Sequence, residues 1–419
     1  MVSDHTRDGG TRRSFLRRTA ATGALGATAL AGCLNGGGGS VSDLKVGYVS
    51  SLSGPFEVFG RAGLNGAKLA RDDLEDELDT SIEIVTGDTE LNPQTGQERV
   101  EELVSREEID FAMGGVSSAV AGSIGAWTSR NGVVYFPTGA HSDTLTGSDC
   151  GEYMFRPTCS NSMLANTVGA EMVGAADSWY VLYSDYVWGQ TAQAAVSGIL
   201  EDEGKEVVGK SAVPFPSDDY TQYVNEANAS DAEGIALLIA GLDLRKAISV
   251  ITNRGIQDDY TFAMHQLEDV VLWGLGEENA GILDIAGQVW GPASPGGDEF
   301  KQRVADNYET GPYVRHYLGY VSMDQAVRAV DRAGGADPDD MRDALEGHQL
   351  EDSPVVDMKD GGDMYWRECD HQLVQPAFGV GARSVGEMED SPYNNWFTVE
   401  ETYAGDDVVL SCDETGCSL

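Results

Sequence analysis

The sequence predicts an α/β protein with two similar lobes, each built around a parallel sheet. Three observations point to this class. Short apolar runs alternate with amphipathic segments of helical spacing from Leu44 onward, a pattern that favours right-handed βαβ units. The same alternation begins again near residue 178. The chain also has 419 residues, more than a single hydrophobic core usually serves.

The first round of alternation occupies residues 44–140. The turn Ser53-Gly54-Pro55-Phe56 ends the first strand, and Asn92-Pro93 introduces the second helix. The predicted elements are strands at 44–52, 81–90, 109–118 and 133–140, and helices at 60–78, 92–107 and 119–132.

The second round predicts a similar lobe, and a third region follows it. The second lobe has strands at 178–189, 205–215, 231–241 and 261–266, and helices at 190–204 and 243–255. A long helical pattern at 313–335 belongs to neither lobe by sequence order, and residues 365–383 predict a strand pair joined by a polar turn.

The net charge of −42 restricts the partners of this chain. Asp and Glu number 69 against 27 Lys and Arg, and the acidic excess is spread along the sequence. Such a surface repels nucleic acid and anionic membranes, so we expect no nucleic-acid partner. Apolar residues interleave with the acids, which indicates a solvated surface adapted to high salt and a halophilic, haloarchaeal source.

The N-terminus predicts an export signal. Arg12-Arg13-Ser14-Phe15-Leu16 is followed by a short Ala/Gly/Leu stretch and by Leu30-Ala31-Gly32-Cys33. This set resembles the twin-arginine signal of a lipoprotein, which implies cleavage before Cys33 and lipid on its new N-terminus. A plain signal peptide with an incidental cysteine is the alternative. The Gly/Ser-rich segment up to residue 43 is typical of a tether, and Asn228-Ala229-Ser230 is a glycosylation sequon whose modification the sequence leaves open.

Five cysteines remain after Cys33 is assigned to lipid. In an oxidising compartment the simplest pairing joins neighbours and leaves Cys369 free. The expected disulfides are Cys150–Cys159 and Cys412–Cys417.

Motifs for catalysis, cofactors and metals are absent from the sequence. There is no phosphate-binding Gly-rich loop, no His-Glu-x-x-His and no Gly-x-Ser-x-Gly elbow. We expect no enzyme, no cofactor and no metal site. Ligands of open α/β sheets bind at the carboxyl ends of strands, and those ends are rich here in Ser, Thr, Gly and aromatic residues.

These strand-end sequences resemble type I periplasmic solute-binding proteins, specifically the branched-chain amino acid and amide receptors of ABC importers. The resemblance is carried in order by "KVGYVSSLSGPF", "IDFAMGGVSSAV", "VVYFPTGAHSD", "YSDYVWGQT" and "RKAISVITNRGI". It implies two Rossmann-like lobes joined by a three-crossover hinge, with permease and ATPase subunits as partners.

The resemblance also implies the boundaries of the parts. We expect a signal at 1–32, a tether at 33–43, a first lobe at 44–156 plus 283–362, a second lobe at 157–282 plus 363–385, and a tail at 386–419.

The same resemblance implies which residues touch a ligand. The loop "GGVSS" would hold a carboxylate or amide oxygen, "PTGAH" forms a second contact loop, and "DYVWG" supplies an aromatic contact. The expected residues are Ser117, Ser118, Thr138, Gly139, Ala140, His141, Tyr186 and Trp188, with Phe56 and Tyr313 as weaker candidates. A helix N-cap is the alternative role of Ser117 or Ser118.

Gln266 stands where amino acid receptors place an acid for the ligand ammonium. A buried ammonium needs an anionic partner, whereas an amide or urea does not. Gln266 therefore favours an amide-like or urea-like ligand, and a shift of two residues would restore an acid, Glu268.

The expected function is capture of a small solute by hinge closure, on the outer face of the cell membrane. The protein would touch the membrane only through lipid on Cys33 and act as a monomer. A sensory receptor of the same fold and an amide hydrolase using His141 or His265 are the alternatives.

Overall fold

The computed structural model of the chain describes residues 43–351, 353–359 and 362–419. The predicted signal at 1–32, Cys33 and the tether up to residue 42 lie outside these residues. Within the described ranges, no helix is long and apolar enough to cross a membrane.

The first sheet is a four-stranded parallel sheet with strand order β2-β1-β3-β4. Its strands and helices alternate along the chain as predicted for residues 44–140. Apolar positions of the helices are buried against the sheet. The elements are β1 (Asp43–Ser50), α1 (Glu57–Leu78), β2 (Ser81–Asp88), α2 (Pro93–Glu102), β3 (Phe111–Gly114), α3 (Ser118–Asn131) and β4 (Tyr135–Pro137), with short helical turns at Gly54–Phe56, Leu103–Glu107 and Asp143–Thr146.

The second sheet has seven strands in the order β13-β12-β9-β8-β7-β5-β6. The strands from β5 to β9 are parallel, and β12 runs antiparallel to both β9 and β13. The elements are α4 (Asn161–Ala175), β5 (Ser178–Ser184), α5 (Val187–Asp202), β6 (Glu206–Val213), α6 (Thr221–Asn228), β7 (Gly234–Leu238), α7 (Asp243–Arg254), β8 (Thr261–Met264), β9 (Ile285–Gln288), β12 (Ala377–Ala382) and β13 (Phe397–Tyr403).

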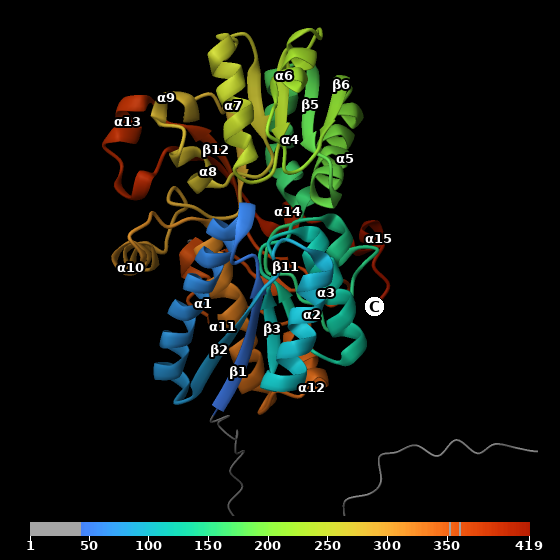
Figure 1. Cartoon of the computed structure of the whole chain (residues 1–419), viewed down its shortest axis with the longest axis vertical. Helices are drawn as coiled ribbons and strands as arrows, with labels where there is room; N and C mark the ends of the chain where they lie inside the picture. Colours follow the sequence, from blue (N-terminus) through green and yellow to red (C-terminus); the bar gives the residue numbers. More distant parts are fainter. Residues whose placement is uncertain (1–42, 352, 360–361) are drawn as a thin grey trace, which may run out of the picture. The chain divides into compact units, whose positions relative to one another are not determined.

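The remaining helices include α11 (Val314–Ala333), which packs along α1 (Figure 1). The two helices approach so closely that a Cβ on Gly319 would lie 1.9 Å from the carbonyl oxygen of Gly63. This contact assigns the long predicted helix to the first sheet. The other elements are α8 (Asp269–Trp273), α9 (Glu277–Ala280), α10 (Asp298–Tyr308), α12 (Pro338–Leu345), β10 (Tyr365–Trp366), β11 (Leu373–Val374), α13 (Val385–Glu389), α14 (Gly405–Val408) and α15 (Cys412–Thr415), with short turns at Asp357–Lys359 and Pro392–Asn394.

The strand pairing moves three expected boundaries. Strand β9 lies within 283–362, which was expected in the first lobe, but it pairs with β8 and β12 of the second sheet. The expected tail at 386–419 contributes β13 to that sheet. Conversely, β10 and β11 pair with each other, and Trp366 packs on Phe136 of β4 and on Phe155. Because this indole is buried against the first sheet, residues 365–374 belong with that sheet and not with the expected second lobe.

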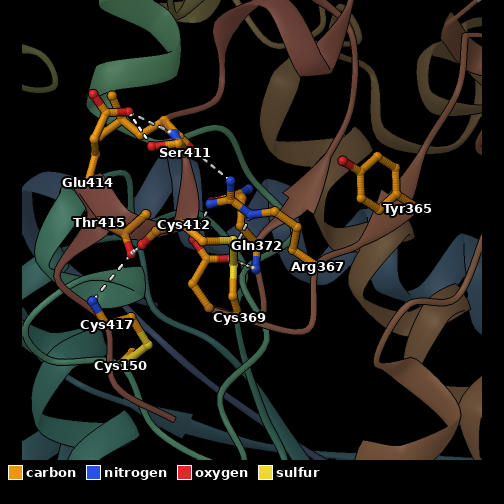
Figure 2. The surroundings of a disulfide bond; sticks show 12 residues. Cys150, Tyr365, Arg367, Cys369, Gln372, Ser411, Cys412, Glu414, Thr415 and Cys417 are labelled. Atoms are coloured by element: carbon orange, nitrogen blue, oxygen red, sulfur yellow. Dashed lines mark hydrogen bonds and ion pairs between the residues drawn. A yellow bond between two sulfur atoms is a disulfide. The ribbon is translucent and has the colours of Figure 1, made fainter.

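The predicted disulfide pairing is wrong. Cys150 bonds to Cys417 with Cα atoms 5.7 Å apart, Cys369 bonds to Cys412 at 6.1 Å, and Cys159 is a free, fully buried thiol. The C-terminal segment folds back over two distant parts of the chain, so each of its cysteines meets a partner far away in sequence (Figure 2). The spacing of the cysteines in the sequence could not show where the C-terminal segment folds back.

Candidate functional site

A cavity lies at the carboxyl ends of parallel strands from both sheets. The β4 side contributes Gly139 and His141, and the β5, β7 and β8 ends contribute aromatic, apolar and polar groups. Its apolar lining includes Phe56, Phe59, Trp188, Ile239, Leu244 and Met264. The cavity therefore combines apolar walls with a few polar groups, as small-molecule sites do.

Five of the predicted ligand-binding residues line this cavity and four do not. Those that line it are Gly139, His141, Tyr186, Trp188 and Gln266. The other four are buried beside it: Ser117, Ser118, Thr138 and Ala140. Phe56 also lines the cavity, whereas Tyr313 is buried with its hydroxyl donating to the carbonyl of Val58 at 2.9 Å.

Two of the four have hydroxyls that make structural hydrogen bonds. Thr138 accepts from the backbone N–H of Gly114 at 3.0 Å and so ties the loop after β4 to the end of β3. Ser118 is the first residue of α3 and accepts from the N–H of Ser142 at 3.2 Å. Ser117 is the N-cap of α3, although its side chain makes no capping bond. These groups shape the loops that border the cavity.

His141 lines the cavity and has one ring nitrogen without a hydrogen-bond partner in the described part of the chain. Its Nδ1 lies 2.8 Å from the carbonyl oxygen of Cys159, while its Nε2 has no protein partner among the described residues. Burial, and then the charge of Arg315, lower the pKa of this imidazole well below its usual value, so the ring is neutral. A carbonyl can only accept, so Nδ1 carries the proton and Nε2 is a hydrogen-bond acceptor.

Tyr186 and Trp188 come from the β5–α5 junction and form one aromatic wall. Their rings stack with centroids 6.0 Å apart, and Tyr186 also stacks on Phe215 at 5.3 Å. The indole Nε1 of Trp188 donates to Oε1 of Gln266 at 2.8 Å. The side-chain amide of Gln266 thus holds the indole in place from the strand end of β8.

Sequence reasoning missed Arg315, and it considered Glu268 only as the result of a shifted alignment. Arg315 is in the first turn of α11, and Glu268 follows β8 of the second sheet. The guanidinium donates through Nη2 to one carboxylate oxygen and through Nε to the other at 3.2 Å. Both side chains line the cavity and are buried, with 5% and 7% exposure. The only sequence signal was a cation in an otherwise apolar stretch of the long helix.

Gly139 makes room for this arginine. Its carbonyl accepts from Nη1 of Arg315, and a Cβ at this position would lie 2.0 Å from the same nitrogen. The aromatic ring of Phe59 lies 5.3 Å from the guanidinium carbon on the other side. The guanidinium is thereby fixed between a backbone turn, a ring and a carboxylate.

The described residues offer no arranged group for catalysis or metal binding around this cavity. The free Nε2 of His141 has no serine or cysteine partner there, and Nε2 of His265 bonds to Asn161 at 3.0 Å. No cluster of three or more His, Cys, Asp or Glu side chains in the described ranges could hold a metal ion. What the geometry offers is hydrogen bonding and apolar contact.

The sequence is similar to those of known binding proteins. A family model described as periplasmic binding protein matches residues 43–387. The Leu/Ile/Val-binding protein homolog 4 of Brucella abortus (strain 2308) is 24% identical over 436 residues, which cover 94% of this chain and 96% of the relative.

Solved structures share the fold at lower identity. A periplasmic binding protein from Burkholderia mallei superposes with a TM-score of 0.83 at 23% identity, over 90% of this chain and 99% of the other. An amino acid ABC transporter substrate-binding protein from Pseudomonas fluorescens Pf-5 has a TM-score of 0.81 at 19% identity, over 91% and 100% of the two chains. The two-lobed α/β architecture is common to all three.

Proposed function

The chain belongs to the periplasmic binding protein family, and from this premise we propose that it is the extracytoplasmic substrate-binding protein of an ABC importer. Its solute is a small amino-acid-like, amide-like or urea-like molecule. The name of the Brucella abortus relative supports the amino-acid-like class of solute, and the name of the Pseudomonas fluorescens protein supports an ABC transporter as the partner.

One observation carries this proposal: a cavity lined from both sheets that contains a buried, unpaired hydrogen-bonding group. Gly139, His141 and Arg315 face it from the first sheet, and Trp188 and Glu268 face it from the second. An unpaired buried polar atom costs free energy unless a ligand or water satisfies it. A ligand that contacts both sides stabilises the closed arrangement of the lobes, which is the form a permease would recognise.

The attachment to the cell follows from the N-terminal sequence. We propose export by the twin-arginine route, removal of residues 1–32 and a lipid on Cys33 that holds a monomeric receptor at the outer face of the membrane. One lipid group near a membrane gives a tether without a spanning segment.

A thermal-shift screen in molar KCl tests the proposed function. The panel contains aliphatic amino acids, short amides, urea and aromatic acids. A ligand at about 100 times its Kd adds about 2.7 kcal/mol to the free energy of unfolding, which a melting curve resolves easily. If no compound of the panel shifts the Tm, the proposed function is wrong.

Two tryptophan variants locate the binding event. Trp188→Ala removes a wall of the cavity and should abolish the shift given by any active compound. Trp127→Ala changes a half-buried indole on α3 outside the cavity and should keep it. Equal loss in both variants would contradict binding in this cavity.

A further inference from the structure

The guanidinium of Arg315 has donors left over after its protein contacts. It carries five N–H groups. Two donate to the carboxylate of Glu268 and one to the carbonyl of Gly139. The other two have no acceptor among the described residues. Arg315, Glu268 and Gly139 all line the cavity, so a ligand bound there would lie next to this guanidinium.

The carboxylate of Glu268, in contrast, is already occupied. It accepts both bonds of the Arg315 fork and a third from Nε2 of Gln266 at 3.0 Å. An ammonium group could reach this carboxylate only by displacing Arg315. That would strip a buried cation of its partner, which is one of the most costly changes in a protein interior.

His141, the third polar group of the cavity, supplies a hydrogen-bond acceptor and no charge. His141 offers Nε2 as an acceptor to an N–H or O–H group. The ion pair makes the site neutral as a whole, so a ligand without charge adds no uncompensated charge to a buried space.

We propose that Arg315 is the specificity-determining residue of the cleft: it blocks Glu268 from ammonium-bearing ligands and selects a neutral carboxamide-type group. The carbonyl oxygen of that group accepts from the free N–H groups of Arg315, and its own N–H donates to Nε2 of His141. This inference rests on the proposed function, and it narrows the solute to one without an α-ammonium group.

Three probes that share an isopropyl group test the inference on the unmodified chain. Isobutyramide is neutral, isobutylamine carries an ammonium, and valine carries an ammonium and a carboxylate. Isothermal titration in molar KCl should give isobutyramide a Kd at least about tenfold lower than that of either other probe. A Kd for valine or isobutylamine equal to or below that of isobutyramide overturns the inference and leaves the proposed function intact.

If all three probes bind weakly, the thermal-shift panel tests the inference. If the compounds of the thermal-shift panel that bind are short amides or urea, the inference is supported, and if they are aromatic acids, it is overturned. If the binders are α-amino acids, it is overturned. If nothing in the panel binds, the proposed function fails and the inference falls with it.

Replacing Arg315 by an uncharged residue distinguishes a role in ligand specificity from a purely structural role. Arg315→Met keeps the apolar stem against Phe59 and frees the carboxylate of Glu268. The preference should reverse: isobutyramide weakens by about tenfold or more, while isobutylamine gains affinity. Parallel losses for both probes would contradict the assigned role.

Arg303→Met is the matched control. Arg303 pairs with Asp73 through two bonds of 2.7 and 2.8 Å, but it does not line the cavity. Arg303→Met removes the ion pair with Asp73 and should leave the order of the Kd values of the three probes unchanged. Should Arg315→Met fail to fold, the probe series on the unmodified chain still decides the matter.

Discussion

At the scale of single residues, His141 owes its role to a proton position fixed by a backbone carbonyl. The carbonyl of Cys159 holds the N–H on Nδ1, which leaves Nε2 of this cavity-lining ring as an acceptor without a partner among the described residues. Phenylalanine fills a similar volume without the acceptor. His141→Phe should therefore weaken the tightest compound of the panel by about tenfold, the value of one hydrogen bond. Titration calorimetry measures this, and an unchanged Kd would show that Nε2 does not contact the ligand.

Asp269 gives a prediction for pH at the same scale. Burial raises the pKa of this carboxyl from 3.8 to about 8, and its Oδ1 has no partner among the described residues. Between these two pKa values the folded chain holds a proton that the unfolded chain has lost, so stability falls as pH rises. Asp269→Asn needs no proton and should gain stability over the wild type from about pH 5 to about pH 8.

The gain should grow by up to about 1.4 kcal/mol for each pH unit in that window. Urea denaturation of both proteins at several pH values measures the difference, which cancels the titration of the other acidic groups. A difference that stays constant with pH would mean that Asp269 titrates normally. Because Gln288 donates to Oδ2 at 2.9 Å, the asparagine oxygen can take over that bond.

At the scale of elements, the contact between α1 and α11 depends on glycine. A Cβ on Gly319 would stand 1.9 Å from the carbonyl oxygen of Gly63, and backbone cannot move aside cheaply. Gly319→Ala should lower the free energy of unfolding by about 1–3 kcal/mol or more.

The matched control is Gly174→Ala in α4, where a Cβ would meet nothing within 4 Å. This change should raise stability by about 0.5–1 kcal/mol, because alanine restricts the unfolded chain and favours helix. Thermal melts of both variants compare the two effects. Destabilisation by Gly174→Ala of the same size would show that helix α4 is more crowded than its surroundings indicate.

The sequence predicted the elements inside the regular alternation better than those outside it. The alternation over residues 44–140 had a clear period, and the four strands of the first sheet follow it. Strand β9 is fully buried and stands outside that alternation, so no period distinguishes it. Strand β13 carries exposed acids on an edge and resembles tail sequence. Both were assigned to the wrong part of the chain because only their pairing reveals their sheet.

The sequence predicted the site residues that follow strand ends. It did not predict the residue that a helix distant in the sequence contributes to the site. Gly139, His141 and Trp188 stand directly after β4 and β5, and all three line the cavity. Arg315 comes from a helix that sequence order could not assign to either lobe. Its partner Glu268 was two residues from the aligned position. The pairing of these two charges is a property of packing between distant segments.

At the scale of the whole molecule, the C-terminal segment connects both sheets by covalent bonds. It leaves the second sheet at β13. It then reaches the disulfide between Cys417 and Cys150 (Figure 2), and Cys150 follows the last strand of the first sheet. On the way, Cys412 bonds to Cys369, close in sequence to the β-bridge between Arg156 and Gln372. The disulfide between Cys417 and Cys150 thus adds a covalent connection between the segments that follow the two sheets.

The two disulfides should differ in their contribution because they close loops of different length. Cys150–Cys417 spans 267 residues and Cys369–Cys412 spans 43. By chain entropy the first restricts the unfolded state by about 5.6 kcal/mol and the second by about 4 kcal/mol, both as upper values. Replacing each pair by serines should therefore lower the unfolding free energy more for the long loop. Denaturant titrations without reductant measure both variants. A larger loss for Cys369→Ser/Cys412→Ser would mean that local packing around Arg367, which bonds to the carbonyl of Leu410 and to Asp370, outweighs loop entropy.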